Sequence, residues 1–225
     1  MTKNLSLLNV LYCLRTTVMF LWFQLFDVYF LSLYILLLDG LTETDVIFVM
    51  DSSEEVTQSN YRDQKEAIKS IAHSMKVPSG RSRASVVTYG NIPTLVVKFD
   101  GYQSFNSLEN VIDRAPLIGG RRRIDLALAN AGRVLSEARS SVRRNVILFT
   151  SGRGDSSSRN LYEAAKRIFN EKAVLYIVAI GRNPYFEELT AVVTSPRDVF
   201  NVSSFRNLGR DAEKVATSVK QRPCK

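Results

Sequence analysis

The chain has 225 residues, of which 45% are hydrophobic, 23% charged and 10% aromatic. A chain of this length and composition can bury one sizeable core, which excludes disordered, collagenous and disulfide-scaffold proteins for most of the sequence. Its 30 basic and 22 acidic residues leave a formal net charge of +8, which favours contact with an acidic surface such as nucleic acid, glycosaminoglycan or anionic membrane.

Residues 1–40 form a hydrophobic leader with two basic and two acidic side chains. Within it, residues 16–38 are long enough to span a bilayer as a helix, although Asp27 interrupts them. Three interpretations stay open: a cleaved signal peptide, an uncleaved signal anchor, or translated sequence upstream of the true start. The first two predict a secreted or extracellular matrix protein, or a type II membrane protein anchored through residues 16–38 with its domain outside.

The rest of the sequence predicts one domain over residues 41–221 and a short tail over residues 222–225. The two cysteines, Cys13 and Cys224, lie near opposite ends of the chain, so the sequence contains no internal disulfide framework. Asn201 opens an Asn-Val-Ser sequon, which predicts glycosylation if the domain enters the secretory pathway.

Short β-branched runs alternate with helical stretches from Thr44 onward, which is typical of a parallel sheet. In chain order we expect a strand at 45–51, a helix at 61–75, strands at 84–89 and 94–99, helices after Ser104 and after Gly119–Gly120, a strand at 145–150, a helix at 161–169, a strand at 173–180, a helix at 186–193, a strand at 198–202 and a helix at 205–219. The short link between the second and third strands favours an antiparallel hairpin. The expected fold is α/β: a doubly wound, Rossmann-like domain whose mostly parallel six-stranded sheet has one antiparallel edge strand and helices on both faces.

Ligands of doubly wound sheets bind at the carboxyl ends of the strands, where residues 51–55, 119–125 and 150–155 should meet. A nucleotide-dependent enzyme is the alternative class, but the first strand is followed by Asp-Ser-Ser-Glu-Glu and not by a glycine-rich phosphate loop. One histidine, His73, and two terminal cysteines supply neither a nucleophile pair nor a His/Cys metal cluster. We therefore expect a protein that is not an enzyme.

Several motifs follow one another in a fixed order along residues 45–219. They are the strand and loop of residues 45–53, Gly119–Gly120 followed by Ala127–Leu128, the strand and turn of residues 146–152, and the closing segments 176–181, 187–189 and 199–202. Together they resemble the von Willebrand factor A (vWA) domain, in the style of the A domains of matrix proteins such as type VI collagen chains. The resemblance implies an extracellular adhesion or interaction module that binds matrix or cell-surface proteins.

In the vWA family these loops form a metal-ion-dependent adhesion site (MIDAS): an Asp-x-Ser-x-Ser loop, a Thr after the glycine pair and a later Asp supply hard oxygen ligands for Mg²⁺. This sequence keeps Asp51 and Ser53, whereas Glu55 replaces the second Ser, Arg122 or a neighbouring arginine replaces the Thr, and Ser151 replaces the Asp. A guanidinium is always protonated and cannot ligate a cation. We expect a degenerate site without a cofactor, in which Arg122 replaces the cation and pairs with Asp51, with Glu55 as a second candidate partner. The alternative is an Mg²⁺ site that uses Asp51, Ser53 and Glu55 while the arginines point outward.

Residues 121–144 contain seven arginines against two acids: Arg121, Arg122, Arg123, Arg133, Arg139, Arg143 and Arg144 against Asp125 and Glu137. Such a run is either a solvated surface or a site for an acidic protein face or a sulfated polysaccharide. We predict that Arg121, Arg122 and Arg123, with Arg153 from a later loop, contact the partner. Nucleic acid is not expected, because the sequence contains no nucleic-acid-binding module.

Overall fold

The computed structural model describes residues 43–221 except 79–80, 103 and 182–184. The predicted leader and the predicted tail lie outside these residues, so both stay predictions. None of the helices in the described ranges is long and apolar enough to cross a membrane.

The described elements alternate as the sequence predicts, and their ends differ from the predicted ends by about three residues or fewer. In chain order they are β1 (Thr44–Asp51), α2 (Gln58–Ser74), β2 (Arg83–Tyr89), β3 (Pro93–Val97), α3 (Phe105–Asp113), α4 (Ile124–Val134), the 3-10 helix η1 (Leu135–Glu137), β4 (Arg143–Thr150), α5 (Ser158–Asn170), β5 (Val174–Ile180), α6 (Phe186–Thr190), η2 (Pro196–Asp198), β6 (Val199–Val202), η3 (Phe205–Asn207) and α7 (Leu208–Gln221).

The strands of the described domain form a six-stranded sheet in the order β3-β2-β1-β4-β5-β6. Neighbouring strands run parallel except β2 and β3, which pair antiparallel at one edge. The predicted doubly wound α/β fold with one antiparallel edge strand is therefore confirmed.

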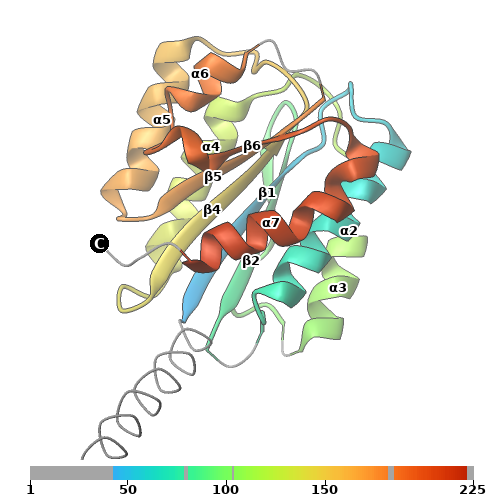
Figure 1. The fold of residues 1–225 in the computed structure, drawn as a ribbon, viewed down its shortest axis with the longest axis vertical. Helices are drawn as coiled ribbons and strands as arrows, with labels where there is room; N and C mark the ends of the chain where they lie inside the picture. Colours follow the sequence, from blue (N-terminus) through green and yellow to red (C-terminus); the bar gives the residue numbers. More distant parts are fainter. Residues whose placement is uncertain (1–42, 79–80, 103, 182–184, 222–225) are drawn as a thin grey trace, which may run out of the picture. The chain divides into compact units, whose positions relative to one another are not determined.

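Alternate side chains of the central strand β1 enter two separate cores. Val46, Phe48 and Met50 pack on the face covered by α2, α3 and α7, and Ile47 and Val49 pack on the face covered by α4, α5 and α6. Figure 1 shows these helices as two layers on opposite sides of the sheet. Because both faces of β1 are buried, its sequence is an unbroken apolar run and does not alternate with polar residues.

Side-chain caps decide where two of the helices start. Thr57 Oγ1 accepts a hydrogen bond from the backbone N–H of Asn60 at 3.2 Å, so α2 begins three residues before the predicted start at Tyr61. Ser104 caps α3 as predicted, in a capping box with Ser107. The apolar spacing along a helix cannot reveal such polar first turns, which explains the displaced start of α2.

The strand order places the topological switch point between β1 and β4. The chain goes from β1 toward β2 on one side and from β4 toward β5 on the other, so the loops that follow β1 and β4 diverge. The parallel register pairs Val49 with Leu148, so β1 and β4 end at the same level. In such sheets the diverging loops leave a crevice at the carboxyl edge, and the candidate site lies there.

Candidate functional site

Asp51, the last residue of β1, is fully buried and is the anionic centre of the site. Its Oδ1 accepts hydrogen bonds from Ser53 N at 3.0 Å and Ser53 Oγ at 2.7 Å. Its Oδ2 accepts hydrogen bonds from Ser151 N at 3.0 Å, Ser151 Oγ at 2.9 Å and Arg122 Nε at 2.9 Å. Both carboxylate oxygens are therefore satisfied by groups of the protein, as burial of a charge requires.

The guanidinium of Arg122 lies directly on this carboxylate, and the residue is only 4% exposed. Its Nη2 donates to Glu55 Oε2 and to Ser151 Oγ, each at 3.0 Å, and its Nη1 donates to the backbone oxygen of Arg153 at 3.3 Å. Burial by itself lowers the pKa of Arg122, but the charge of Asp51, followed by Tyr89 and Glu55, raises this pKa above the usual arginine value. The site therefore contains a permanent positive charge.

The loop after β4 holds the backbone of Arg122 in place. Asp155 Oδ2 accepts a hydrogen bond from Arg122 N at 2.9 Å, and Asp155 N donates to Arg122 O at 2.8 Å. Gly152 leaves room for the side chain, since a Cβ at this position would lie 2.5 Å from Arg122 Nη1. These contacts fix both ends of Arg122, the backbone and the guanidinium.

A buried glutamine fixes the end of β1 from the α2 side. Gln64 Oε1 accepts a hydrogen bond from Asp51 N at 3.1 Å, and Gln64 Nε2 donates to Asp51 O at 2.8 Å. Tyr89 packs in the core on the opposite face of the sheet, which α4, α5 and α6 cover, and its hydroxyl donates to Phe149 O at 3.0 Å. Burial, reinforced by the charge of Asp51, raises the pKa of Tyr89 well above its usual value, so the phenol stays neutral and keeps donating.

The glycine pair brings the segment that carries Arg122 against the loop after β1. Gly119 N donates to Ser52 O at 2.7 Å, and Glu54 N donates to Gly120 O at 2.9 Å. Gly90 makes the close approach possible, because a Cβ there would lie 2.0 Å from Gly119 O. The three segments expected to meet at the carboxyl edge, residues 51–55, 119–125 and 150–155, are thus hydrogen-bonded to one another.

The other arginines that were predicted to contact a partner differ in their exposure and in their ion pairs. Arg121 is exposed, whereas Arg123 forms a two-point ion pair with Asp125 at 3.0 and 2.9 Å. Arg153 lies 3.7 Å from Glu188 and 5.0 Å from the centre of the Tyr185 ring. Arg153, Gly154 and Asp155 form an Arg-Gly-Asp tripeptide, and both of its charged side chains contact other residues of the domain.

Three arginines of the 121–144 run lie at the opposite edge of the sheet, where β1 and β4 begin. There the buried carboxylate of Asp45 binds Arg83 and Arg139, with closest distances of 2.6 and 2.8 Å. Arg143 donates to the backbone oxygen of Lys220 at 2.9 Å, and Arg144 lies 3.4 Å from Glu171. The seven arginines therefore do not form one continuous surface.

Gln64 and Asp155 are two site residues that were not predicted from the sequence. Gln64 occupies the buried stripe of α2 together with Tyr61, Ile68 and Ile71, and a polar residue at an apolar helix position was the available signal. Asp155 gave no signal of its own, because its role depends on where the loop after β4 lies in space.

The fold and the residues at its carboxyl edge define the class of protein. The family model of the von Willebrand factor type A domain matches residues 45–214, and the chain belongs to this family. The resemblance stated from the sequence is therefore confirmed.

Similar curated proteins include von Willebrand factor A domain-containing protein 2 of Xenopus laevis, 26% identical over 179 residues, and the collagen alpha-1(XXI) chain of the same species, 22% identical over 183 residues. These matches cover 78% and 80% of this chain but 22% and 18% of the relatives, so the chain spans about a fifth of their length. The collagen alpha-6(VI) chain of Mus musculus is 25% identical over 167 residues, 72% of this chain and 7% of the relative.

Among solved structures, proximal thread matrix protein 1 from the mussel byssus, described with a zinc-occupied MIDAS motif, matches with a TM-score of 0.72 and 26% identity. The match covers 81% of this chain and 47% of that chain. A von Willebrand factor type A structure from Catenulispora acidiphila has a TM-score of 0.67 at 19% identity, covering 81% and 44% of the two chains, which shows the shared fold alone.

Proposed function

We propose that the domain is a non-enzymatic interaction module that works outside the cell and binds a matrix or cell-surface protein. Its membership of the vWA family supports this proposal, as do relatives that include collagen chains and a byssus matrix protein. His73 is exposed on α2, and its ring packs edge-on against Phe105 with the ring centres 5.3 Å apart.

In this module Arg122 takes the place that a divalent cation has in the MIDAS of the family. The observation that carries the proposal is the guanidinium of Arg122 on Asp51, at 2.9 Å and almost completely buried. The same guanidinium also binds Glu55 and Ser151, the two other residues that replace family ligands. One fixed cation thus joins the three segments that a metal would otherwise join.

The side chains around Arg122 do not fit a bound divalent ion. Ser151 Oγ and Glu55 Oε2 both accept hydrogen bonds from Arg122 Nη2, so these two oxygens face the guanidinium where a ligand would face a metal. A divalent ion on the same carboxylate would lie within about 4 Å of the guanidinium, and the repulsion would cost several kcal/mol. Binding of a partner by this domain is therefore expected to be independent of metal.

A solid-phase assay tests this function with purified matrix proteins, namely fibrillar collagen, fibronectin and laminin, with heparin and duplex DNA as comparison surfaces. We expect saturable binding to at least one of the proteins, equal in the presence of EDTA and of MgCl₂. Loss of binding in EDTA would overturn the metal-free site. Binding to none of the three proteins, or a preference for DNA, would overturn the assignment to matrix recognition.

Secretion and glycosylation belong to the same proposal. Asn201 lies on the short edge strand β6 with its side chain exposed, where a glycan can be accommodated. The chain produced in cells that secrete proteins should appear in the medium or on the cell surface, and a peptide N-glycosidase should increase its mobility. Retention inside the cell without a glycan would contradict the predicted compartment, and amino-terminal sequencing of the secreted material would decide between cleavage and anchoring.

A further inference from the structure

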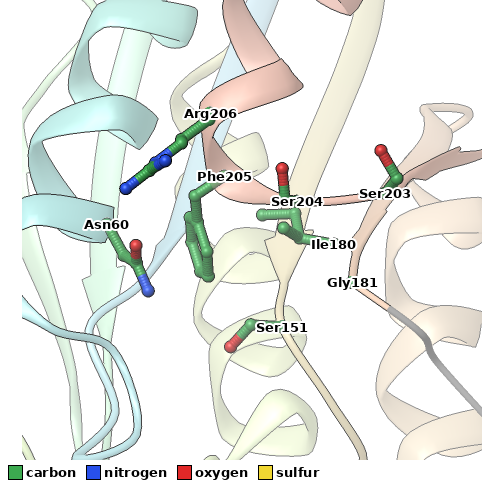
Figure 2. A pocket seen from close by; sticks show the side chains of 8 residues that line it. All are labelled: Asn60, Ser151, Ile180, Gly181, Ser203, Ser204, Phe205 and Arg206. Atoms are coloured by element: carbon green, nitrogen blue, oxygen red, sulfur yellow. The ribbon is translucent and has the colours of Figure 1, made fainter.

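A hollow of about 300 Å³ lies beside the Arg122 site at the carboxyl ends of β4, β5 and β6. Figure 2 shows the residues that line it, which come from α2, from the strand ends and from η3: Asn60, Ser151, Ile180, Gly181, Ser203, Ser204, Phe205 and Arg206. Ser151 belongs to both sites, because its hydroxyl donates to Asp51 and accepts from Arg122. The Arg206 hollow, as we name this set of residues, is thus a direct neighbour of the proposed site.

Some polar side chains of the Arg206 hollow are hydrogen-bonded within the domain, and others are not. The hydroxyls of Ser151 and Ser203 already have partners, since Ser203 Oγ accepts from Asn207 Nδ2 at 2.6 Å. The amide of Asn60, the hydroxyl of Ser204 and the guanidinium of Arg206 make no hydrogen bond or ion pair with the described part of the chain. In Figure 2 the polar ends of Asn60 and Arg206 lie on the same side of the hollow.

The charged residues that line the Arg206 hollow favour the binding of an anion. The residues that line it include one cation and no carboxylate. The two carboxylates of the neighbouring site, Asp51 and Glu55, are both paired with Arg122. Arg122 itself is buried with its fork occupied, whereas Arg206, the cation that lines the hollow, is exposed to a partner.

The size and chemistry of the Arg206 hollow favour one acidic side chain over a sulfated polysaccharide. A polysulfated chain is bound by rows of cations, whereas a single arginine with a neighbouring amide donor matches a single carboxylate. Phe205 and Ile180 supply apolar surface for the short aliphatic stem of such a side chain.

We propose that the Arg206 hollow receives a glutamate or aspartate side chain of a protein partner, with Arg206 as the charged donor and the amide of Asn60 as an additional donor. This inference rests on the proposed function, because it needs a carboxyl edge where Arg122 has closed the usual position of the cation. It gives the domain a metal-free way to hold an acidic residue.

The test is a titration of the ¹⁵N-labelled full chain, followed by NMR, with N-acetyl-glutamate N-methylamide as the probe. We expect saturable shifts of the side-chain signals of Arg206 and Asn60, in EDTA and in MgCl₂ alike, and no response to the glutamine analogue. Arg206→Gln should weaken binding by about tenfold or more, because it removes a charge-assisted hydrogen bond. Arg210→Gln, which removes an exposed arginine on α7 outside the hollow, should leave binding unchanged.

Four results would overturn the inference. If no saturable shift appears in either buffer while matrix-protein binding persists, the Arg206 hollow does not bind an acidic side chain, and the proposed function is unaffected. Equal losses in Arg206→Gln and Arg210→Gln would indicate a diffuse charge effect, and tighter binding of a heparin oligosaccharide than of the probe would indicate a polysaccharide surface. Binding of the probe in MgCl₂ but not in EDTA, abolished by Asp51→Asn, would instead place the acid on a metal and overturn the replacement of the cation by Arg122.

Discussion

Asp51 and Arg122 form a buried ion pair whose two members depend on each other. The carboxylate of Asp51 is completely buried, and one of the five hydrogen bonds that it accepts comes from a charged donor. Removing one member of such a pair leaves the other charge buried and uncompensated, which costs more than the intact pair contributes.

We therefore expect Arg122→Met to lower the free energy of unfolding by about 3 kcal/mol, at the lower end of the range for broken buried pairs, because four neutral donors remain on Asp51. Urea denaturation measures the loss. Arg122→Lys should recover part of it, since a lysine keeps the charge but cannot form the fork. The exposed neighbour Arg121→Gln is the matched control, and an equal effect of the two substitutions at positions 121 and 122 would contradict the pairing.

At the opposite edge of the sheet, Asp45 makes the stability of the domain depend on pH. Burial by itself raises the pKa of Asp45, but hydrogen bonds from Arg83 and Arg139 outweigh it and hold the pKa below its usual value of 3.8. A carboxyl whose pKa is lowered by folding stabilises the fold above its usual pKa, and this contribution is lost as the pH falls through the folded-state pKa.

Asp45→Asn should accordingly cost about 2–3 kcal/mol at neutral pH, and the gap to the wild type should close as the pH falls below about 3.8. Unfolding in urea at a series of pH values gives both curves. The control is Glu163→Gln, which removes an exposed carboxylate on α5 and should give the same dependence of stability on pH as the wild type. A gap of constant size at every pH would show that the charge of Asp45 is not responsible.

At the scale of elements, the loop between β4 and α5 positions Arg122, which pairs with Asp51 at the end of β1. Asp155 exchanges two hydrogen bonds with the backbone of Arg122, at 2.9 and 2.8 Å, and Asp155→Ala removes the charge-assisted one. We expect this substitution to lower the free energy of unfolding by about 1–2 kcal/mol, while Asp155→Asn, which keeps an acceptor oxygen, costs less. Thermal unfolding compares the two variants, and equal losses would indicate that the side-chain oxygen does not hold Arg122.

The elements were predictable from the sequence where hydrophobic periodicity decides them. The apolar runs of β1, β4 and β5 predict strands buried on both faces, and the short link between β2 and β3 predicts the antiparallel edge. The meeting of residues 51–55, 119–125 and 150–155 was also predictable, because the carboxyl ends of parallel strands share one edge of the sheet.

The part that was not predicted depends on contacts between residues far apart in the chain. The role of Gln64 requires the crossing of α2 over the end of β1, and the role of Asp155 requires the path of a loop. The Arg206 hollow is built from α2, three strand ends and η3, and no spacing within one segment reveals it.

At the scale of the whole molecule, the arginines that the sequence groups into a basic run do not lie on a single face of the described domain. Arg122 and Arg153 lie at the carboxyl edge, Arg139 and Arg144 lie at the amino edge, and all four are paired with carboxylates. For this reason we place recognition in a defined hollow and not in a long-range field, which salt would screen.

Whether a fixed guanidinium has replaced the divalent ion is tested most directly by calorimetric titration of the full chain with Mg²⁺ and Mn²⁺. The wild type should give no binding isotherm. The variant Glu55→Ser/Arg122→Thr/Ser151→Asp, which restores the donor types of the family around Asp51 and Ser53, should gain one and serves as the positive control. A micromolar isotherm in the wild type that disappears in Asp51→Ala would contradict the replacement of the cation by Arg122.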